Sequence, residues 1–201
     1  MAQSTHGDSR PKGAMSRHDN HSTSEQGTWT TKRIAITALF CSVAAICTLM
    51  VEFPILPGVT WLKYDPSGIV ALVAGFAFGP ATGAIVSTIP YLVHLATQSG
   101  IYGMLMAMLA TIALVLPASL VYRRTPTMRG AIVGLALGAV CALVACIAGN
   151  IIVTPLYTGM STQAVSDLIV PALLPFNLLK IGINCAMCVL VYKPIVRALD
   201  N

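Results

Sequence analysis

Long apolar runs with charged residues clustered at their ends constrain this chain more than any other feature of its sequence. Hydrophobic residues make up 56% of the 201 residues, and charged residues make up 9%. A soluble globular domain has about 25% charged residues, spread along the chain to cover its surface. The sequence therefore predicts an integral membrane protein.

Polar loops divide the apolar part of the chain into segments of the length needed to cross a bilayer. A helix needs about 20 apolar residues to cross about 30 Å of hydrocarbon. The apolar segments are residues 34–51, 67–97, 102–122, 131–153 and 168–191. The second segment is too long for one ordinary crossing and short for two, and Gly79-Pro80 divides it.

Basic residues predict how these segments are oriented. They gather before the first segment (Lys32 and Arg33), in residues 123–129, and after the last segment (Lys193 and Arg197). Because Lys and Arg concentrate in cytoplasmic loops, we place all three groups in the cytoplasm. Residues 67–97 must then begin and end outside, either as two short crossings or as a re-entrant hairpin. We favour two crossings, so the expected fold class is an all-α membrane protein with six transmembrane helices and both termini cytoplasmic.

The chain divides into two parts by composition. Residues 1–28 are polar, rich in Ser, Thr, His and Gly, and lack the apolar core of a signal peptide, so we expect a disordered tail. Residues 29–201 then form the transmembrane domain.

Several classes of function find no support in the sequence. No basic stripe is interleaved with aromatic residues, so we expect no nucleic-acid partner. The sequence contains no HExxH, GxSxG or GxxxxGKS/T motif, so it predicts neither a catalytic centre nor ATP hydrolysis. We expect no metal site, and we interpret Cys185 and Cys188, despite their CxxC spacing, as buried small apolar residues.

Asn177, Lys180 and Asn184 place polar groups inside the last apolar segment. Their spacing of three and then four residues puts them within roughly 60° of one another on one helix face. A lysine near the bilayer centre costs at least about 2.5 kcal/mol, so such residues usually face a cavity or the bundle interior. We therefore expect this face to line an outward-facing pocket. In the alternative interpretation, the asparagines form hydrogen bonds between helices, and the Lys180 side chain extends to the membrane–water interface.

Other polar residues are expected on the outer side of the same pocket. Asn150 lies near the outer end of its segment, where it can face Asn177 and Lys180; ordinary interhelical bonding is the alternative. The long outer loops, residues 52–66 and 154–167, are expected to act as lids. Their aromatic residues include Trp61, Tyr64 and Tyr157.

Tyr91 and His94 lie one turn apart near the outer end of residues 80–97. They form either an aromatic wall of the pocket or ordinary packing. We interpret Met104, Met106 and Met108 as lipid-facing or core residues rather than as part of a cofactor-binding motif.

Small residues recur along one face of the first apolar segment. Ala38 and Ser42 are four residues apart, and Ala45 continues nearly the same face. Small side chains allow another backbone to approach closely, so this face is an association surface. The spacing leaves open whether it packs inside the bundle or against another subunit.

Three motifs resemble the S components of energy-coupling factor (ECF) transporters, and among these the riboflavin-binding branch. The motifs are Glu52-Phe53-Pro54 leading to Leu62-Lys63-Tyr64-Asp65-Pro66-Ser67, then Gly75-Phe76-Ala77-Phe78-Gly79-Pro80, and Pro175-Phe176-Asn177-Leu178-Leu179-Lys180 with Asn184. The resemblance implies a six-helix membrane subunit without ATPase activity that binds riboflavin from outside. It also implies a transmembrane coupling protein and two cytoplasmic ATPases as partners, in the cell membrane of a prokaryote.

The resemblance assigns roles to particular residues. It implies that Asn150, Asn177, Lys180 and Asn184 bind the ligand. From their expected place at the outer side of the pocket, we add Tyr64, Asp65, Tyr91 and Tyr157 to the residues expected to bind it. Ala38, Ser42 and Ala45 are expected to meet the coupling protein. Riboflavin is then a transported ligand, and no cofactor is expected. Two alternatives stay open: an S component for another vitamin or small solute, and a membrane assembly or regulatory subunit without a ligand.

Overall fold

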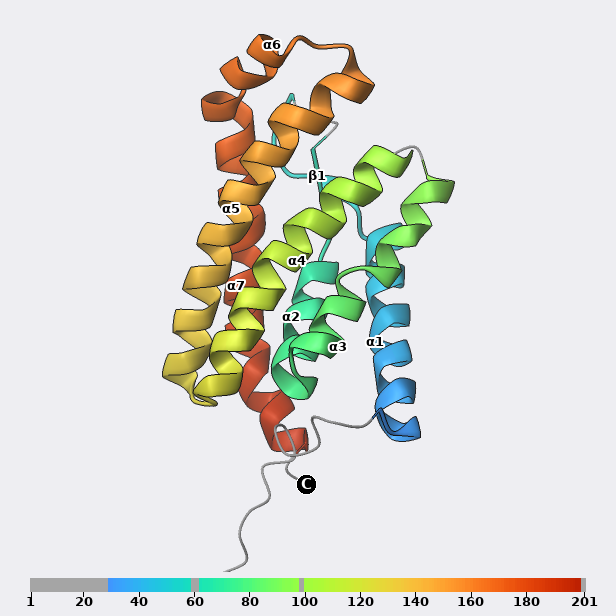
Figure 1. Cartoon of the computed structure of the whole chain (residues 1–201), viewed down its shortest axis with the longest axis vertical. Helices are drawn as coiled ribbons and strands as arrows, with labels where there is room; N and C mark the ends of the chain where they lie inside the picture. The colour runs from blue at the N-terminus through green and yellow to red at the C-terminus, as the bar shows by residue number, and fades with distance from the viewer. Residues whose placement is uncertain (1–28, 59–61, 98–99, 200–201) are drawn as a thin grey trace, which may run out of the picture.

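Helices lying along the longest axis of the molecule form a bundle (Figure 1). The computed structural model describes residues 29–58, 62–97 and 100–199, and of residues 192, 193 and 195–199 the backbone alone. The expected tail, Trp61 and the side chains of Lys193 and Arg197 lie outside this part. In chain order the elements are α1 (Thr31–Met50), β1 (Phe53–Pro54), β2 (Lys63–Tyr64), α2 (Ser67–Phe78), α3 (Pro80–Val86), the 3-10 helix η1 (Ile89–Ala96), α4 (Gly100–Arg124), α5 (Met128–Thr158), α6 (Thr162–Asp167), the π-helical segment η2 (Ile169–Leu173) and α7 (Leu174–Leu199).

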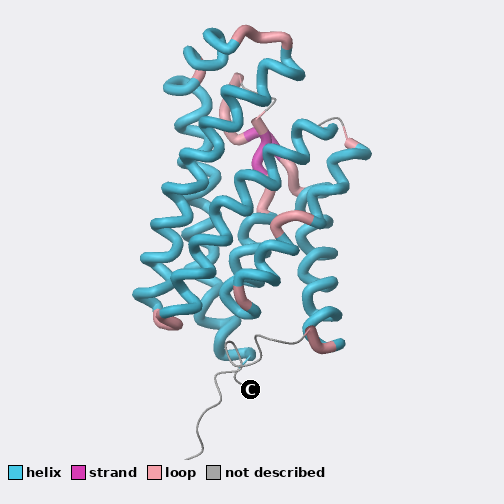
Figure 2. Tube along the Cα trace, viewed as in Figure 1, coloured by secondary structure: helices cyan, strands magenta, loops and turns pink. Residues whose placement is uncertain are grey.

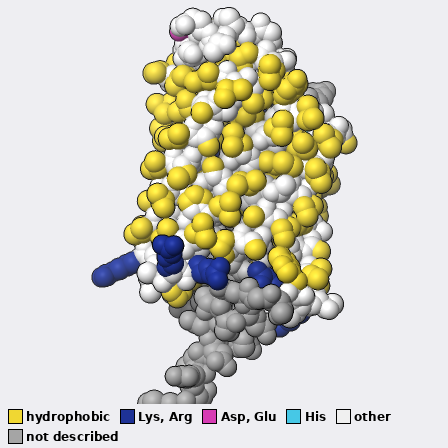
Figure 3. Space-filling view, viewed as in Figure 1, with side chains coloured by type: hydrophobic (Ala, Val, Ile, Leu, Met, Phe, Trp, Pro, Cys, Tyr) yellow, Lys and Arg dark blue, Asp and Glu magenta, His cyan; other side chains and the backbone are white. Residues whose placement is uncertain are grey.

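Within the described residues, four helical stretches are long and apolar enough to cross a membrane. They are Thr31–Met50, Gly100–Arg124, Met128–Thr158 and Ile169–Val191. Hydrophobic side chains cover the visible face of the bundle down to a row of Lys and Arg at one end (Figure 3). Such an extensive apolar surface is suited to the hydrocarbon interior of a bilayer rather than to water, as expected for the integral membrane protein that the composition predicts.

Residues 67–97 fold back on themselves, and the turn lies where the sequence predicts it. Gly79 adopts a φ of 89°, which a residue without a Cβ enters readily, and Pro80 begins α3. The two arms are in close contact, since a Cβ on Gly83 would lie 2.8 Å from the Cα of Gly75. The division at Gly79-Pro80 is confirmed. The count of six crossings stays a prediction, because α2, α3 and η1 are each shorter than a full crossing.

The second arm of this hairpin is interrupted, which the hydropathy of the sequence does not predict. The α-helix α3 ends at Val86, and a 3-10 helix begins at Ile89. Pro90 lacks a backbone N–H, and its ring would clash with the carbonyl of Val86 in a continuous α-helix. The break therefore follows from the proline.

Helices α4 and α5 pack closely because α5 presents glycines to α4. A Cβ on Gly134 would lie 2.6 Å from the carbonyl oxygen of Ala118, and one on Gly138 would lie 2.3 Å from that of Leu114. Glycine at these positions lets the two backbones meet, as in other membrane helix pairs.

Two irregular segments hold the end of the bundle opposite the basic row. The loop after α1 returns into the bundle as the β1–β2 hairpin (Figure 2), in which Phe53 pairs with Tyr64. Tyr64 and the following Asp65 are both buried. Before α7, the N–H of Leu173 donates to the carbonyl of Leu168 at 3.0 Å, a π-type bond. Leu62, Val165, Leu173 and Phe176 form a small apolar core between these segments.

Candidate functional site

A pocket opens between the α1–α2 loop and helices α4, α5 and α7. Its lining residues are Glu52, Leu62, Lys63, Asp65, His94, Tyr102, Gly103, Met106, Ala107, Ala110, Cys146, Asn150, Tyr157, Phe176, Asn177 and Lys180. They come from five regions of the sequence. The bundle therefore assembles this site from residues that are far apart in the chain.

Helical spacing explains which residues of α5 and α7 reach the pocket. On α5, Cys146, Asn150 and Tyr157 are separated by four and seven residues, so they share one face. On α7, Asn177 and Lys180 are three residues apart and line the same pocket. The predicted juxtaposition of Asn150 with Asn177 and Lys180 is therefore present in one pocket.

The two pocket amides are buried and fixed by their own helices. Asn150 Nδ2 donates to the carbonyl of Cys146 at 2.8 Å, and its Oδ1 accepts from Thr154 at 3.0 Å. Asn177 Nδ2 donates to the carbonyl of Leu173 at 2.7 Å. An amide has two N–H donors and two acceptor lone pairs, so each of these bonds uses part of its capacity. Both side chains are thus held in place with polar groups at the pocket wall.

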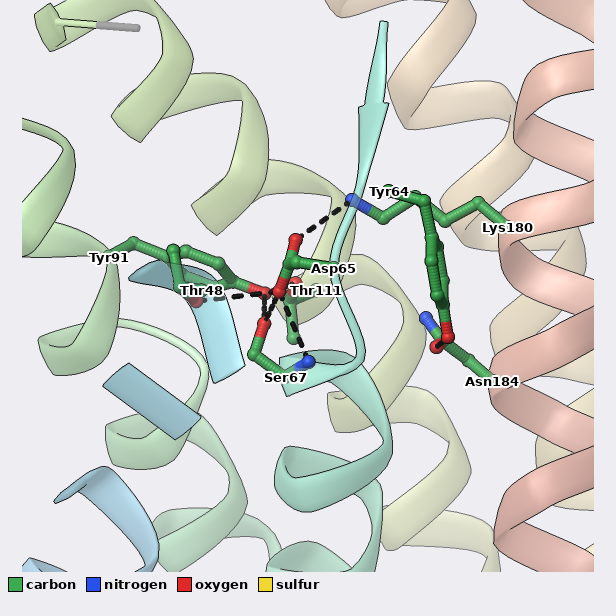
Figure 4. Close-up of polar contacts among 8 residues, drawn as sticks. All are labelled: Thr48, Tyr64, Asp65, Ser67, Tyr91, Thr111, Lys180 and Asn184. Atoms are coloured by element: carbon green, nitrogen blue, oxygen red, sulfur yellow. Dashed lines mark hydrogen bonds and ion pairs between the residues drawn. The ribbon is translucent and has the colours of Figure 1, made fainter. Parts of the chain in front are cut away.

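Lys180 forms a buried ion pair inside the pocket. Its Nζ lies 3.6 Å from Oδ2 of Asp65, and 13% of the Lys180 side chain and 5% of the Asp65 side chain are exposed (Figure 4). A charge removed from water is stable only when it is paired and hydrogen-bonded. The loop residue Asp65 therefore supplies the counter-charge that the α7 lysine needs.

The other oxygen of Asp65 is held by neighbouring elements (Figure 4). Oδ1 accepts from the backbone N–H of Ser67 at 3.1 Å, from the Ser67 hydroxyl, and from Thr48 on α1 at 3.4 Å. Burial opposes the charged form of the carboxyl. The cation of Lys180 and the bonds from Ser67 outweigh this, and they hold the pKa of Asp65 below its usual range.

Tyr91, Tyr64 and Asn184 lie outside the set of residues that line the pocket. Tyr91 is fully buried, and its hydroxyl is 2.7 Å from both Ser67 Oγ and Thr111 Oγ1. Tyr64 Oη donates to Asn184 Oδ1 at 3.1 Å, and both side chains are buried (Figure 4). These predicted ligand contacts therefore pack behind the pocket wall in this structure, where they support Asp65 and the α1–α2 loop.

Aromatic rings form another part of the wall. Tyr102 on α4 stacks on Tyr157 on α5, with ring centroids 5.7 Å apart and planes at 23°. His94 lines the pocket and lies nearly parallel to the ring of Tyr91, at 5.9 Å. In the part of the chain that the structure describes, no three His, Cys, Asp or Glu side chains gather to hold a metal ion. The pocket thus offers flat apolar faces, two amides and a neutralised ion pair.

The sequence of residues 32–192 matches the family model described as "ECF transporter, substrate-specific component". This chain belongs to that family. The resemblance that the three motifs indicate is thereby confirmed, and the chain is assigned to a family of transporter components rather than of enzymes.

Named relatives and a solved structure agree with this assignment. The riboflavin transporter FmnP of Bacillus subtilis (strain 168) is 26% identical over 161 residues, which cover 74% of this chain and 84% of that protein. The riboflavin transporter RibU of Staphylococcus aureus (strain TCH60) is 26% identical over 177 residues, covering 85% and 93%. A structure described as the S component of a bacterial ECF transporter superposes with a TM-score of 0.73 at 25% identity, covering 85% of this chain and 98% of that one.

Several pocket residues of this ECF component were not predicted from the sequence. These are Glu52, Lys63, Tyr102, Met106, Cys146 and Phe176. Helical spacing carries a signal for some of them, because Cys146 lies one turn before Asn150 and Met106 lies one turn after Tyr102. Met106 lines the pocket and lies beside Gly149 of α5, so of the two expected positions it takes the interior of the bundle.

Proposed function

We propose that this ECF component captures riboflavin, or a close flavin, from outside the cell for uptake. One observation carries the proposal: a single pocket gathers Asn150, Asn177 and Lys180 beside the stacked pair Tyr102 and Tyr157. Riboflavin combines a flat ring system with a polar edge and a hydroxylated chain. The two relatives named as riboflavin transporters support the choice of ligand.

The chemistry of the wall suits such a neutral ligand. Aromatic and apolar side chains pack against a flat ring, and a few convergent polar groups fix its orientation. The amides of Asn150 and Asn177 supply both donors and acceptors for the ring edge and the hydroxyl groups. The ammonium of Lys180 adds donors to acceptor atoms of the ring.

The proposed partners are a transmembrane coupling protein and two cytoplasmic ATPases, in the cell membrane of a prokaryote. Ala38 and Ser42 are exposed on α1, and Ala45 is partly exposed, so this face is open to a partner helix. Ser42 Oγ donates to the carbonyl of Ala38 at 2.9 Å, so its hydroxyl is satisfied within the helix. An outward face of small side chains supports subunit contact rather than packing inside this bundle. The orientation that we propose places both termini in the cytoplasm.

Titration of the purified full-length chain with riboflavin tests the proposed function. We expect saturable quenching of tryptophan fluorescence at sub-micromolar riboflavin. Asn177→Ala removes a pocket amide and is expected to weaken binding about tenfold. Gly182→Ala is the matched α7 control, because Gly182 is exposed and a Cβ there would have no neighbour within 4 Å.

The same titration separates the alternatives. If riboflavin causes no saturable quenching but another vitamin or small solute does, the chain is an S component for that solute. If Lys180→Ala leaves all small-molecule binding unchanged and lowers only stability, the polar groups serve helix packing and the chain is an assembly or regulatory subunit.

A further inference from the structure

The two oxygens of the Asp65 carboxylate have different partners. Oδ1 accepts hydrogen bonds from Thr48 and Ser67, whereas Oδ2 faces Nζ of Lys180 at 3.6 Å. A carboxylate that is fixed through one oxygen presents the other in a set direction. The position of the Lys180 ammonium group is therefore dictated by the α1–α2 loop and not by α7 alone.

Further hydrogen bonds prevent this carboxylate from turning away. Ser67 Oγ is 2.7 Å from the hydroxyl of Tyr91, which is 2.7 Å from Oγ1 of Thr111 (Figure 4). The network joins α1, the α1–α2 loop, α2, η1 and α4, and all of its side chains are buried. A ligand that required Asp65 to move would have to break contacts with several elements.

The charges that line the pocket are balanced. Lys180 is paired with Asp65, and at the rim Lys63 lies 3.2 Å from Glu52. Among the described residues that line the pocket, these four are the only ones of the types Lys, Arg, Asp and Glu. An anionic group entering the pocket would therefore meet two lysines that already have counter-ions, and two carboxylates that repel it.

We propose that Asp65 is a positioning residue that cancels the charge of Lys180 and holds its ammonium group at the pocket wall, so that the pocket selects uncharged polar ligands over anions. The inference rests on the proposed function only in taking this pocket as the ligand site. Asp65 acts through Lys180 and determines specificity by charge. The substitution Asp65→Asn keeps an oxygen acceptor for Ser67 and Thr48 but leaves Lys180 without its counter-ion.

Inorganic phosphate is a direct probe of this charge balance. The purified full-length chain is unfolded thermally in phosphate and in sodium chloride of equal ionic strength. We expect phosphate to raise the Tm of Asp65→Asn by at least about 2 °C more than that of the wild type. The double variant Asp65→Asn/Lys180→Met should respond like the wild type. Asp167→Asn, which removes an exposed acid on α6 outside the pocket, should also respond like the wild type.

Flavins give a second readout. The ratio of the Kd values for riboflavin and for its anionic 5′-phosphate ester should shift by about tenfold toward the ester in Asp65→Asn, and return in the double variant. A residue with a merely structural role would weaken both ligands together and leave the ratio unchanged. If neither flavin binds the wild type, the proposed function is wrong, and the phosphate measurement still decides the role of Asp65.

Equal responses of Asp65→Asn and the wild type to phosphate would overturn the proposal. If Asp65→Asn cannot be purified in folded form, wild type and Lys180→Met are compared instead. Equal phosphate responses then support a wild-type lysine that is already neutralised. If phosphate stabilises the wild type saturably and this stabilisation disappears in Lys180→Met, the proposal is contradicted.

Discussion

The hydrogen bond between Tyr64 and Asn184 joins the α1–α2 loop to the last of the three polar residues on one face of α7 (Asn177, Lys180 and Asn184). Its Oη–Oδ1 distance is 3.1 Å, and Tyr64 and Asn184 are 4% and 2% exposed. A Cβ on Gly68 would lie 2.5 Å from Nδ2 of Asn184, so α2 also closes over this amide. These contacts assign Asn184 to packing in the structure as it stands.

Tyr64→Phe tests that assignment. Loss of the hydroxyl removes the donor to a buried amide oxygen, so we expect the free energy of unfolding to fall by about 1–3 kcal/mol. The measurement is equilibrium unfolding of Tyr64→Phe, Asn184→Ala and the double variant. Non-additive losses show that the two side chains act as a pair. A riboflavin Kd that rises in Asn184→Ala but not in Tyr64→Phe would instead make Asn184 a ligand contact.

Spacing along one helix predicts which of its residues share a face, but it does not predict which residues of other elements will meet them. Asn177 and Lys180 were placed together by their separation of three residues, and both line the pocket. Asp65 was expected to bind ligand, whereas its ion pair with Lys180 depends on how the α1–α2 loop enters the bundle. Such a contact between distant segments has no signal in local periodicity.

At the scale of elements, the closeness of α4 and α5 depends on the absence of side chains at Gly134 and Gly138. The carbonyl oxygens facing these glycines belong to backbone, which cannot move aside as a flexible side chain can. Glycine is unfavourable in a helix by about 1 kcal/mol relative to alanine. The close contact between the two helices therefore comes at the cost of a lower helix propensity at these two positions.

Gly138→Ala and Gly182→Ala are expected to have opposite effects on stability. A Cβ at position 138 would lie 2.3 Å from the oxygen of Leu114, so the helices must separate, and overpacking of this kind destabilises by about 1–3 kcal/mol. At position 182 no atom lies within 4 Å of the added Cβ, so better helix propensity should raise stability by up to about 1 kcal/mol. Thermal unfolding of both variants provides the comparison. A higher Tm for Gly138→Ala would contradict the close contact.

The elements themselves were predictable where composition alone decides them. Hydropathy indicates the four long helical stretches, and Gly79-Pro80 indicates the turn between α2 and α3. The change to a 3-10 helix at Ile89 and the π-helical segment before Leu174 depend on which backbone hydrogen bonds survive near Pro90 and Pro171. Hydropathy does not predict such local changes in hydrogen bonding. The change at Ile89 is nevertheless explained by Pro90, which lacks a backbone N–H and cannot continue an α-helix.

At the scale of the whole molecule, charge distinguishes the two ends of the bundle. Lys32 in the first turn of α1, Arg123 and Arg124 at the end of α4, and Arg129 at the start of α5 are exposed at one end. Helix α6 with Asp167 lies at the other end (Figures 1 and 3). The pocket lies toward the α6 end, because its residues on α5 and α7 are close to α6 in the chain. Under the positive-inside rule the basic end is cytoplasmic, and the pocket then faces outward.

Cysteine labelling in intact cells tests this orientation. Gln163→Cys on α6 and Thr125→Cys in the α4–α5 turn introduce exposed thiols at opposite ends. A membrane-impermeant maleimide should label Gln163→Cys in intact cells, and Thr125→Cys only after the cells are opened. The wild type is the control, because five of its six cysteines lie within α1, α5 and α7, where the bilayer should shield them. The sixth, Cys146, lines the pocket and is 3% exposed. Labelling of Thr125→Cys in intact cells would invert the topology and turn the pocket toward the cytoplasm, where it could not capture a solute from outside.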